Sequence, residues 1–491
     1  MINVIFPLRK EYLQAFLDFV QSLFREHNFN EKEQGIFRLI AEEVCLFVKE
    51  TIFLNDEYKD INISLTITES EVSFSFSMKG IPIEFEKIKD YSFDVESFDF
   101  KQEELCLMLA KKYMDKFVFI NHGRNGMEII VSKTNKDSRI NNIIGVESKN
   151  IPNVIFSELP EYEIRTPSES EFIEISRSAY FTYGNTYEDY IYYPQKISQM
   201  QKDGELLSLI AVSKDNKVMG HIALKFNKKT DKFAELGVLF VNPEYRKKGL
   251  ANVLVKSIIN KAKDMNLNSI YARSVTGHPA SQRVFCENGF FDIGLLLDLF
   301  PAKVDLKGMN DTDAEKMSGL LQCLPLKKPR LRYLSIPKRY SLVVQYLYEK
   351  INVAYEEIIL TQKQTNTPYI IAQKNELFNI GTIEIRNLGS SFEECQKLVD
   401  YNIRRLLSDK LDVIYLFINI EETGADKLID YYAEKDFLFS AILPDGFNDS
   451  DVLILQYLNL SKNPFASMKV YSDTSQFLIK TIEKEWEQLQ L

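Results

Sequence analysis

A basic turn in the middle of the chain, with the sequence RKKGLA at residues 246–251, has the residue types of an anion-binding site. An alternating apolar segment ends just before it, and Pro243 would stop that strand because proline cannot donate to the ladder. An amphipathic stretch follows, so the turn should open a helix, where backbone amides have no intrahelical partner and the dipole is positive. Gly249 would let a ligand approach the backbone closely. This context predicts binding of a diphosphate; a solvated surface turn is the alternative.

The same turn resembles the pyrophosphate loop of the GNAT N-acetyltransferase superfamily, whose pattern is Arg/Gln-x-x-Gly-x-Gly/Ala. The resemblance runs from about residue 155 to about residue 305 and includes a later helix that ends at Gly289-Phe290. It implies that acetyl-CoA binds with its pantetheine arm on the main chain of the preceding strand and its pyrophosphate on the amides of the loop. The cofactor-binding residues implied are Leu239, Phe240, Val241, Arg246, Lys247, Lys248, Gly249, Leu250 and Ala251.

The last helix of this region departs from the family pattern. GNAT enzymes often carry an Asn and, seven residues later, a Tyr that serves as general acid to the leaving thiolate; these positions are His278 and Phe285 here. Phenylalanine cannot donate a proton, so the acid must be another group or solvent. The stretch TGHPASQ (276–282) also resembles a GNAT subgroup with a His-x-x-Ser-Gln motif, which adds His278 and Ser281 to the predicted cofactor site.

Candidates for catalysis and acceptor binding flank the same strand. The resemblance implies that Glu235 removes a proton from the attacking amine through water, and the alternative is a solvent-facing strand residue. Three tyrosines before the first hairpin, Tyr183, Tyr187 and Tyr193, are predicted to form the acceptor wall, with core packing as the alternative. His221, on the neighbouring strand, is predicted to face the same cleft unless it is a satisfied core residue.

The elements that must position these residues follow from periodicity. The central block reads as a hairpin, a third strand, a helix, a strand, a helix and a final strand. The segments are 206–213, 218–226, 233–241, 249–265, 269–275, 281–289 and 291–299.

The first third of the chain, residues 1–135, reads as two helices, two alternating strands, a helix and two more strands, which is an α+β sandwich. It resembles the GHKL ATPase fold of anti-sigma-factor kinases through FRLIAEEVCLFVKETI and GIP (80–82). The magnesium-binding Asn of that family is replaced by Phe47 and the adenine-binding Asp by Met78. The lid has become acidic at Glu103-Glu104, so we expect a regulatory or dimerising module that does not bind ATP.

Residues 136–160 lack periodicity and are predicted to be a linker, leaving a GNAT domain at 161–305 and a last domain at 306–491. The last domain repeats the order of the central block, and the spacing from Thr423-Gly424 to Phe437 equals that from Thr276-Gly277 to Phe290. We favour an internal duplication over coincidence. The segment RNLGSSFEE (386–394) stands where the loop should be, and its acidic end predicts a degenerate GNAT-like domain without CoA.

The predicted fold is therefore a multidomain α/β and α+β protein, a GHKL-like sandwich followed by two GNAT-like mixed-sheet domains. The formal net charge of −10 argues against a nucleic-acid-binding surface. The five cysteines form no CxxC pair, which predicts reduced thiols in a cytoplasm and no metal site. The sequence contains no window of 18 apolar residues free of charge, so no membrane span is predicted.

Two functions are compatible with these patterns. The first is an N-acyltransferase that moves an acetyl group from acetyl-CoA to an amine by direct attack, with a protein partner or a second copy binding through the N-terminal domain. The second is a regulatory protein whose GNAT domain senses acyl-CoA without turnover. Phe47, Met78 and Phe285 favour the second, because each replaces a functional family residue.

Overall fold

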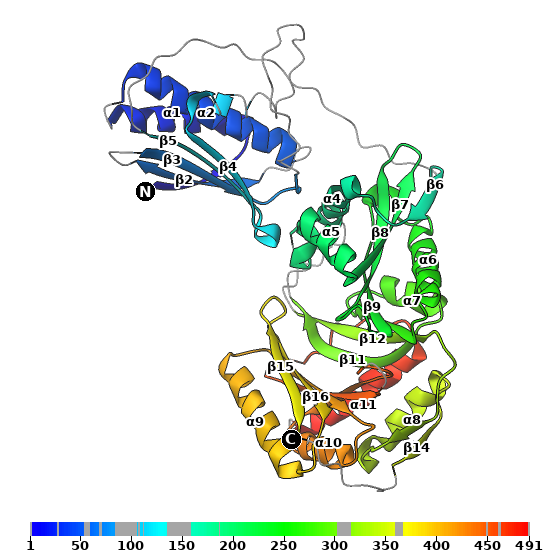
Figure 1. The fold of residues 1–491 in the computed structure, drawn as a ribbon. Coiled ribbons are helices and arrows are strands. Elements are labelled where there is room, and N and C mark those ends of the chain that lie inside the picture. The colour runs from blue at the N-terminus through cyan, green and yellow to red at the C-terminus, as the bar shows by residue number, and fades with distance from the viewer. Residues whose placement is uncertain are drawn as a thin grey trace.

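The computed structural model describes residues 2–26, 29–53, 59–67, 71–83, 106, 109–110, 112–134, 159–185, 187–301, 316–358, 367–447, 450–459 and 463–489. These residues form a five-stranded sheet near the N-terminus, a twelve-stranded sheet and a small two-stranded sheet (Figure 1). Most of the predicted linker and the acidic pair at 103–104 lie outside the described ranges.

The N-terminal sheet is antiparallel throughout, with strand order β1-β2-β3-β5-β4, and helices α1 and α2 cover one of its faces (Figure 1). Alternating apolar residues form the strands because one face is buried. Helix α2 begins with a capping box in which Asn30 and Glu33 each accept a hydrogen bond from the other's backbone. Strand β1 was not predicted. The bounds are β1 Ile2–Pro7, α1 Lys10–Glu26, α2 Glu31–Phe47, β2 Asp60–Ile67, β3 Glu71–Met78, β4 Lys116–Asn121 and β5 Met127–Thr134.

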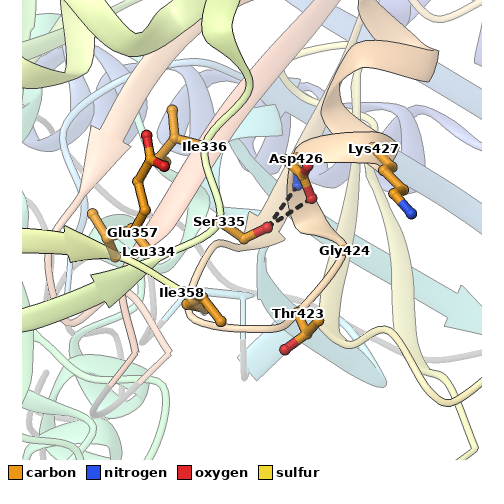
Figure 2. Close-up of a pocket in the computed structure, with 9 residues that line it drawn as sticks. All are labelled: Leu334, Ser335, Ile336, Glu357, Ile358, Thr423, Gly424, Asp426 and Lys427. Atoms are coloured by element: carbon orange, nitrogen blue, oxygen red, sulfur yellow. Dashed lines mark hydrogen bonds between the residues drawn. The ribbon is translucent and has the colours of Figure 1, made fainter. Parts of the chain in front are cut away.

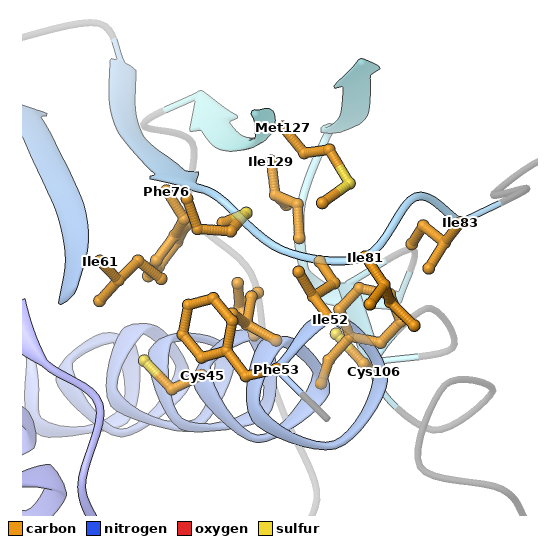
Figure 3. Packing of buried hydrophobic residues seen from close by; sticks show 14 of the residues in the cluster. Cys45, Ile52, Phe53, Ile61, Phe76, Ile81, Ile83, Cys106, Met127 and Ile129 are labelled. Atoms are coloured by element: carbon orange, nitrogen blue, oxygen red, sulfur yellow. The ribbon is translucent and has the colours of Figure 1, made fainter. Parts of the chain in front are cut away.

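The two positions at which the sequence departs from the GHKL pattern, Phe47 and Met78, lie in the apolar core of this domain. Phe47 is fully buried and Met78 is buried beside it in the same apolar cluster. Cys45 and Cys106 lie in this cluster with Ile52 and Phe76 (Figure 3). Burial raises the pKa of the Cys45 thiol well above its usual range, so it is a neutral core residue.

The central unit contains every element predicted for it, and it forms one half of the twelve-stranded sheet. Strand β12 follows the predicted domain boundary at 305 but lies between β10 and β11, where it completes the central unit. The bounds are β6 Tyr162–Arg165, α4 Phe172–Tyr183, η5 Asp189–Tyr192, α5 Pro194–Asp203, β7 Leu206–Ser213, β8 Val218–Lys225, β9 Phe233–Val241, α6 Leu250–Asp264, β10 Ser269–Val275, α7 Ala280–Glu287, β11 Phe291–Phe300 and β12 Met317–Pro325.

The C-terminal unit repeats the topology of the central one. Reading outward from the middle of the large sheet, the orders are β11-β12-β10-β9-β8 on one side and β18-β19-β17-β16-β15 on the other. The chain visits the two sets in the same order. The bounds are β13 Arg332–Leu334, α8 Ser341–Lys350, β14 Tyr355–Glu357, β15 Tyr369–Asn375, β16 Ile380–Asn387, α9 Phe392–Ser408, β17 Val413–Asn419, α10 Ala425–Ala433, β18 Leu438–Leu443, β19 Val452–Leu458 and α11 Asp473–Leu489.

The two halves of the sheet meet at β11 and β18, where Gly294 pairs with Ala441. A Cβ atom added at Gly294 would lie 2.0 Å from the Cβ of Ala441 and 2.8 Å from the carbonyl oxygen of Ser440. Glycine is therefore required for the strands to approach this closely.

We expect Gly294→Ala to lower the free energy of unfolding of the large sheet by about 1–3 kcal/mol, because the seam must open to admit the methyl group. The single tryptophan, Trp486 on α11, packs against the C-terminal core and reports this transition by its fluorescence in urea. Gly35→Ala is the control, since no atom lies within 4 Å of a Cβ at that helical position. If the urea midpoint of the Trp486 fluorescence transition is unchanged in Gly294→Ala, the close approach of β11 and β18 at Gly294 is contradicted.

Candidate functional site

Strands β9 and β10 separate halfway along their length. They pair in parallel from Phe233–Ser269 to Leu236–Ala272, and the recorded pairs end there although β9 continues to Val241. On its other side β10 pairs with β12 along its whole length, from Ser269 to Val275. The main chain from residue 237 to residue 241 therefore faces a gap between two strands of one sheet. Unpaired strand groups of this kind are an available edge for an extended ligand.

A bulge in the ladder between β8 and β9 lies at the same place, where the register shifts between His221–Phe240 and Ala223–Gly237. Val238 has a φ of 53°, which is strained for a β-branched residue. His221 holds this conformation, because its Nδ1 lies 2.8 Å from the carbonyl oxygen of Val238 and its Nε2 lies 3.0 Å from the hydroxyl of Ser208. Such strain persists where surrounding contacts fix it, and it concentrates at functional sites.

His221 is completely buried and therefore does not form an exposed wall, contrary to the role predicted for it. Burial lowers its pKa to about 4, and the bond to Val238 opposes this shift only in part. The imidazole is thus neutral at physiological pH, with Nδ1–H as the donor to the bulge. Its role is to support the strand.

The basic turn lies directly after the gap. Gly249 has a φ of 81° and immediately precedes helix α6. No atom lies within 4 Å of a Cβ built there, so the glycine leaves open space above the first turn of the helix. Arg246 is half-buried, and its Nε donates to the carbonyl oxygen of Val241 at 3.1 Å. The site therefore combines the amides at the start of α6, which no side-chain cap covers, with an open approach and three basic residues, which suits a diphosphate.

Helix α7 closes the opposite side of the gap. His278 and Ser281 are half-buried at its beginning, and the Ser281 hydroxyl is a buried atom with no hydrogen-bond partner among the described residues. Phe285 is buried and packs on Phe290 with ring centroids 5.2 Å apart. Gln282, the last residue of the His-x-x-Ser-Gln motif, is fully buried.

Gln282 connects this helix to a distant part of the chain. Its Nε2 donates to the carbonyl oxygens of Val275 and Lys469, each at 2.9 Å, and its Oε1 accepts from the amide of Tyr471 at 2.9 Å. The amide of Lys469 also donates to the carbonyl oxygen of Thr276 at 2.7 Å. We call residues 469–471 the C-terminal strap. Local sequence patterns do not predict this strap, because Gln282 and Lys469 are 187 residues apart.

A cleft of about 270 Å³ opens at the other end of β9, beside Glu235. Its walls combine charged groups with aromatic rings. The lining residues are Glu188, Tyr190, Met200, Glu205, Lys225, Phe226, Asn227, Phe233, Glu235 and Tyr271. Tyr190 is 8% exposed, and its hydroxyl is buried without a hydrogen-bond partner in the described part of the chain. A ligand or water must satisfy this hydroxyl, so the cleft is a candidate acceptor site.

Glu235 is held in ion pairs rather than facing solvent. Its Oε1 accepts from Arg273 at 2.5 and 2.9 Å, and its Oε2 lies 3.4 Å from Lys225. Lys225 also donates to Glu188 at 2.7 Å. Burial raises the pKa of Glu235, but Arg273 and Lys225 more than offset it and hold the carboxyl well below its usual range. Glu235 is thus ionised and a weak base while both partners remain bound.

The predicted acceptor tyrosines divide between two places. Tyr183 and Tyr187 are half-buried and stacked, with ring centroids 4.3 Å apart, and the Tyr183 hydroxyl donates to the carbonyl oxygen of Leu239 at 3.1 Å. They lie beside the separated part of β9. Tyr193 instead packs against Gly123 of the N-terminal domain, away from the cleft. Tyr190, which does line the cleft, was not predicted, because the sequence does not show which way the rings of a 3₁₀ turn face.

The equivalent strands of the C-terminal unit remain together. Strands β16 and β17 pair from Ile380–Val413 through Ile385–Ile418, and the side chain of Asn419 then donates to the carbonyl oxygen of Arg386 at 3.0 Å. The following helix α9 is capped by Ser391 and carries two acidic residues in its first turn. This half therefore offers neither an open strand edge nor a basic turn.

A cavity of about 160 Å³ in the same unit lies between β13 and the start of α10 (Figure 2). The Ser335 hydroxyl donates to the Asp426 carboxylate at 2.8 Å and accepts from the Asp426 amide at 3.1 Å. Thr423 and Gly424 stand at its edge. Ser335 and Asp426 bond to each other, as at a structural helix cap.

Comparison with known proteins identifies the central unit. Residues 170–290 match the model of the acetyltransferase (GNAT) family. These residues are a GNAT acetyltransferase domain. A search of curated proteins gives no match.

Several solved structures are similar to the chain over about a third of its length. One is a spermidine N-acetyltransferase from Vibrio cholerae in complex with CoA and spermine, with 16% identity, 34% of this chain and 95% of that chain covered, and a TM-score of 0.27. Another is a ribosomal-protein-S5-alanine acetyltransferase from Vibrio fischeri, with 17% identity, 36% and 100% covered, and a TM-score of 0.28. At these values we base the assignment of the GNAT domain on the family match.

Two further properties concern the described residues only. They contain no group of three or more His, Cys, Asp or Glu side chains arranged to hold a metal ion. None of the helices in these ranges has the length and apolar character needed to span a bilayer.

The buried imidazole of His221 predicts a pH dependence of stability. Its pKa of about 4 in the folded protein lies below the ordinary value of 6.5, so its contribution is complete above pH 6.5 and is lost as the pH falls towards 4. Between pH 6.5 and pH 4, we expect the free energy of unfolding of the parent to fall by up to about 1.4 kcal/mol per pH unit relative to that of His221→Gln. Urea unfolding at pH 7 and pH 5, followed by circular dichroism, measures the difference.

Ser208→Ala is the matched control, because it removes one partner but keeps the imidazole, and it should retain the acid-dependent loss. A stability difference between parent and His221→Gln that stays constant from pH 7 to pH 5 would show that His221 is not buried in the neutral form.

Proposed function

We propose that this protein is an N-acetyltransferase that moves the acetyl group of acetyl-CoA to an amine acceptor by direct attack. One observation carries the proposal: the separated, bulged end of β9 leads directly into an open basic turn at the start of α6. An extended pantetheine arm would bind the main chain of Leu239, Phe240 and Val241 as an added strand. The pyrophosphate would then reach the amides of residues 246–251, with His278 and Ser281 on the opposite side.

The reaction needs no covalent enzyme intermediate. The neutral amine nitrogen attacks the thioester carbonyl carbon, the C–S bond breaks, and CoA leaves as a thiolate that takes up a proton from solvent or a nearby hydroxyl. The proton of the amine passes to Glu235 through water. The low pKa of Glu235 makes it a better electrostatic partner for an ammonium than a proton acceptor, unless Lys225 moves aside when the amine enters the cleft. Glu188, Tyr190 and the stacked pair Tyr183–Tyr187 would bind the acceptor.

For the outer domains we propose supporting roles. The buried Phe47 and Met78 favour a degenerate GHKL-like module that binds a protein or a second copy of the chain rather than ATP. The repeated strand order and the fully paired β16–β17 favour a degenerate GNAT-like scaffold at the C-terminus.

A second candidate function is a sensor that binds acyl-CoA without turnover. Two observations favour it: the ion pairs that hold Glu235 to Arg273 and Lys225, and the absence of a hydroxyl at Phe285. Both functions require the same cofactor site, so they differ only in acetyl transfer.

We expect Gly249→Glu to abolish acetyl-CoA binding, since its side chain fills the open space at the helix start and its charge repels the pyrophosphate. Isothermal titration calorimetry measures the dissociation constant. Gly249→Ala carries the same backbone strain, from a φ of 81°, without the charge, and should bind at least tenfold more tightly than Gly249→Glu. If Gly249→Glu binds as the parent does, the turn is not the pyrophosphate site.

We expect Glu235→Gln to reduce kcat by about 10²-fold or more while the dissociation constant of acetyl-CoA stays unchanged, because it removes the carboxylate that accepts the amine proton once Lys225 has moved aside. Release of CoA thiol with a panel of primary amines measures kcat. Glu188→Gln removes the other carboxylate bound to Lys225 and should chiefly raise the KM of the amine. A parent that binds acetyl-CoA but acetylates none of the panel would favour the sensor.

A further inference from the structure

The N-terminal domain contacts the GNAT domain at the wall of the cleft. The turn between β4 and β5, which contains the 3₁₀ segment Gly123–Asn125, reaches the segment η5 that precedes α5 (Figure 1). The amide of Arg124 donates to the Asp189 carboxylate at 3.1 Å. The side chain of Asn121 donates to the carbonyl oxygen of Tyr192 at 3.0 Å. Both ends of η5 are therefore bound by one turn of the other domain.

Gly123 makes this close contact possible. It has a φ of 58°, and a Cβ there would lie 2.2 Å from the ring of Tyr193 and 2.6 Å from the Asp189 carboxylate. Only glycine combines this backbone conformation with so close an approach. The fit is thus specific to one position of the turn against η5.

A second set of contacts fixes helix α4, which leads into the same wall. Lys59 donates to the hydroxyl of Tyr180, and its ammonium also lies 4.8 Å from the centre of that ring. Arg177 donates to the carbonyl oxygen of Pro82 at 3.2 Å. The apolar core of the N-terminal domain continues without interruption into Tyr190, Ile191 and the strained strand at Val238. Buried residues of the two domains therefore share one apolar cluster in this region.

Asp189, which the N-terminal domain binds, stands between two residues that line the cleft. Glu188 supplies a carboxylate to Lys225, and Tyr190 supplies the unsatisfied hydroxyl. The backbone of η5 cannot shift without moving both. We propose that the N-terminal domain is a positioning element of the acceptor cleft, in which the Gly123–Asn125 turn sets Glu188 and Tyr190 through Asp189. The role of the N-terminal domain in acceptor binding rests on the proposed function. The contact between the Gly123–Asn125 turn and η5 does not.

The effect should fall on the amine and spare acetyl-CoA, because the Gly123–Asn125 turn contacts η5 and not the basic turn at 246–251. Asp189→Ala removes the acceptor of the Arg124 amide and should raise the amine KM about tenfold, the effect expected for one hydrogen bond to a charged group. Asp189→Asn keeps an oxygen at the same place, so its amine KM should lie close to that of the parent. The dissociation constant of acetyl-CoA should be equal in all three proteins.

A measurement without catalysis tests the contact itself. In Gly123→Ala, hydrogen–deuterium exchange of the full-length protein should quicken about tenfold or more at residues 187–193 and stay unchanged at 246–251. Gly289→Ala is the control for left-handed strain, since its φ of 88° is similar and its nearest neighbour, Leu324, lies 3.4 Å from the added Cβ. It should leave 187–193 protected.

Parent-like protection of residues 187–193 in Gly123→Ala would overturn the inference. An amine KM that is unchanged in Asp189→Ala, or a loss in acetyl-CoA affinity of the same size as the loss in amine affinity, would do so as well. Failure of the parent to bind acetyl-CoA would instead overturn the proposed function, and the exchange measurement would still decide whether the domain holds η5. If Gly123→Ala does not fold, the two Asp189 variants give the same decision by exchange at 187–193.

Discussion

The separation of β9 from β10 is the feature on which the candidate site depends. A sheet is stabilised by pairing its main-chain groups, so a strand that leaves its neighbour must be held open by other contacts. Here the bulge at Val238, the imidazole of His221 and the hydroxyl of Ser208 do so from within the core. A ligand that adds a strand at this edge would pair with main chain that β10 leaves without a strand partner, although the carbonyl oxygens of Leu239 and Val241 already accept from Tyr183 and Arg246.

The C-terminal unit shows the same architecture without that separation. Its order of strands and helices matches the central unit, yet β16 and β17 stay paired throughout and an acidic helix start replaces the basic turn. The difference between the two units is therefore local. The two units differ at one strand edge and one helix start, while the order of their five corresponding strands is the same.

Local patterns in the sequence predicted the helices and strands well, but they did not predict which strands lie side by side in the sheet. The strand, basic turn and helix from Phe233 to Asp264 were readable because each depends on its own periodicity. The position of β12 between β10 and β11 was not, since strand order is set by contacts distant in sequence. For the same reason the ion pair between Glu235 and Arg273 and the direction of Tyr190 could not be foreseen, whereas the burial of His221 matches the alternative of a satisfied core residue. The GHKL resemblance stays a prediction.

The C-terminal strap makes the central unit depend on the C-terminal unit for part of its support. Residues 469–471 bond to Thr276 and Gln282, so the helix that borders the cofactor gap takes part of its support from the other repeat. Removing the C-terminal unit would therefore remove hydrogen bonds that hold Gln282 and Thr276 in the central unit.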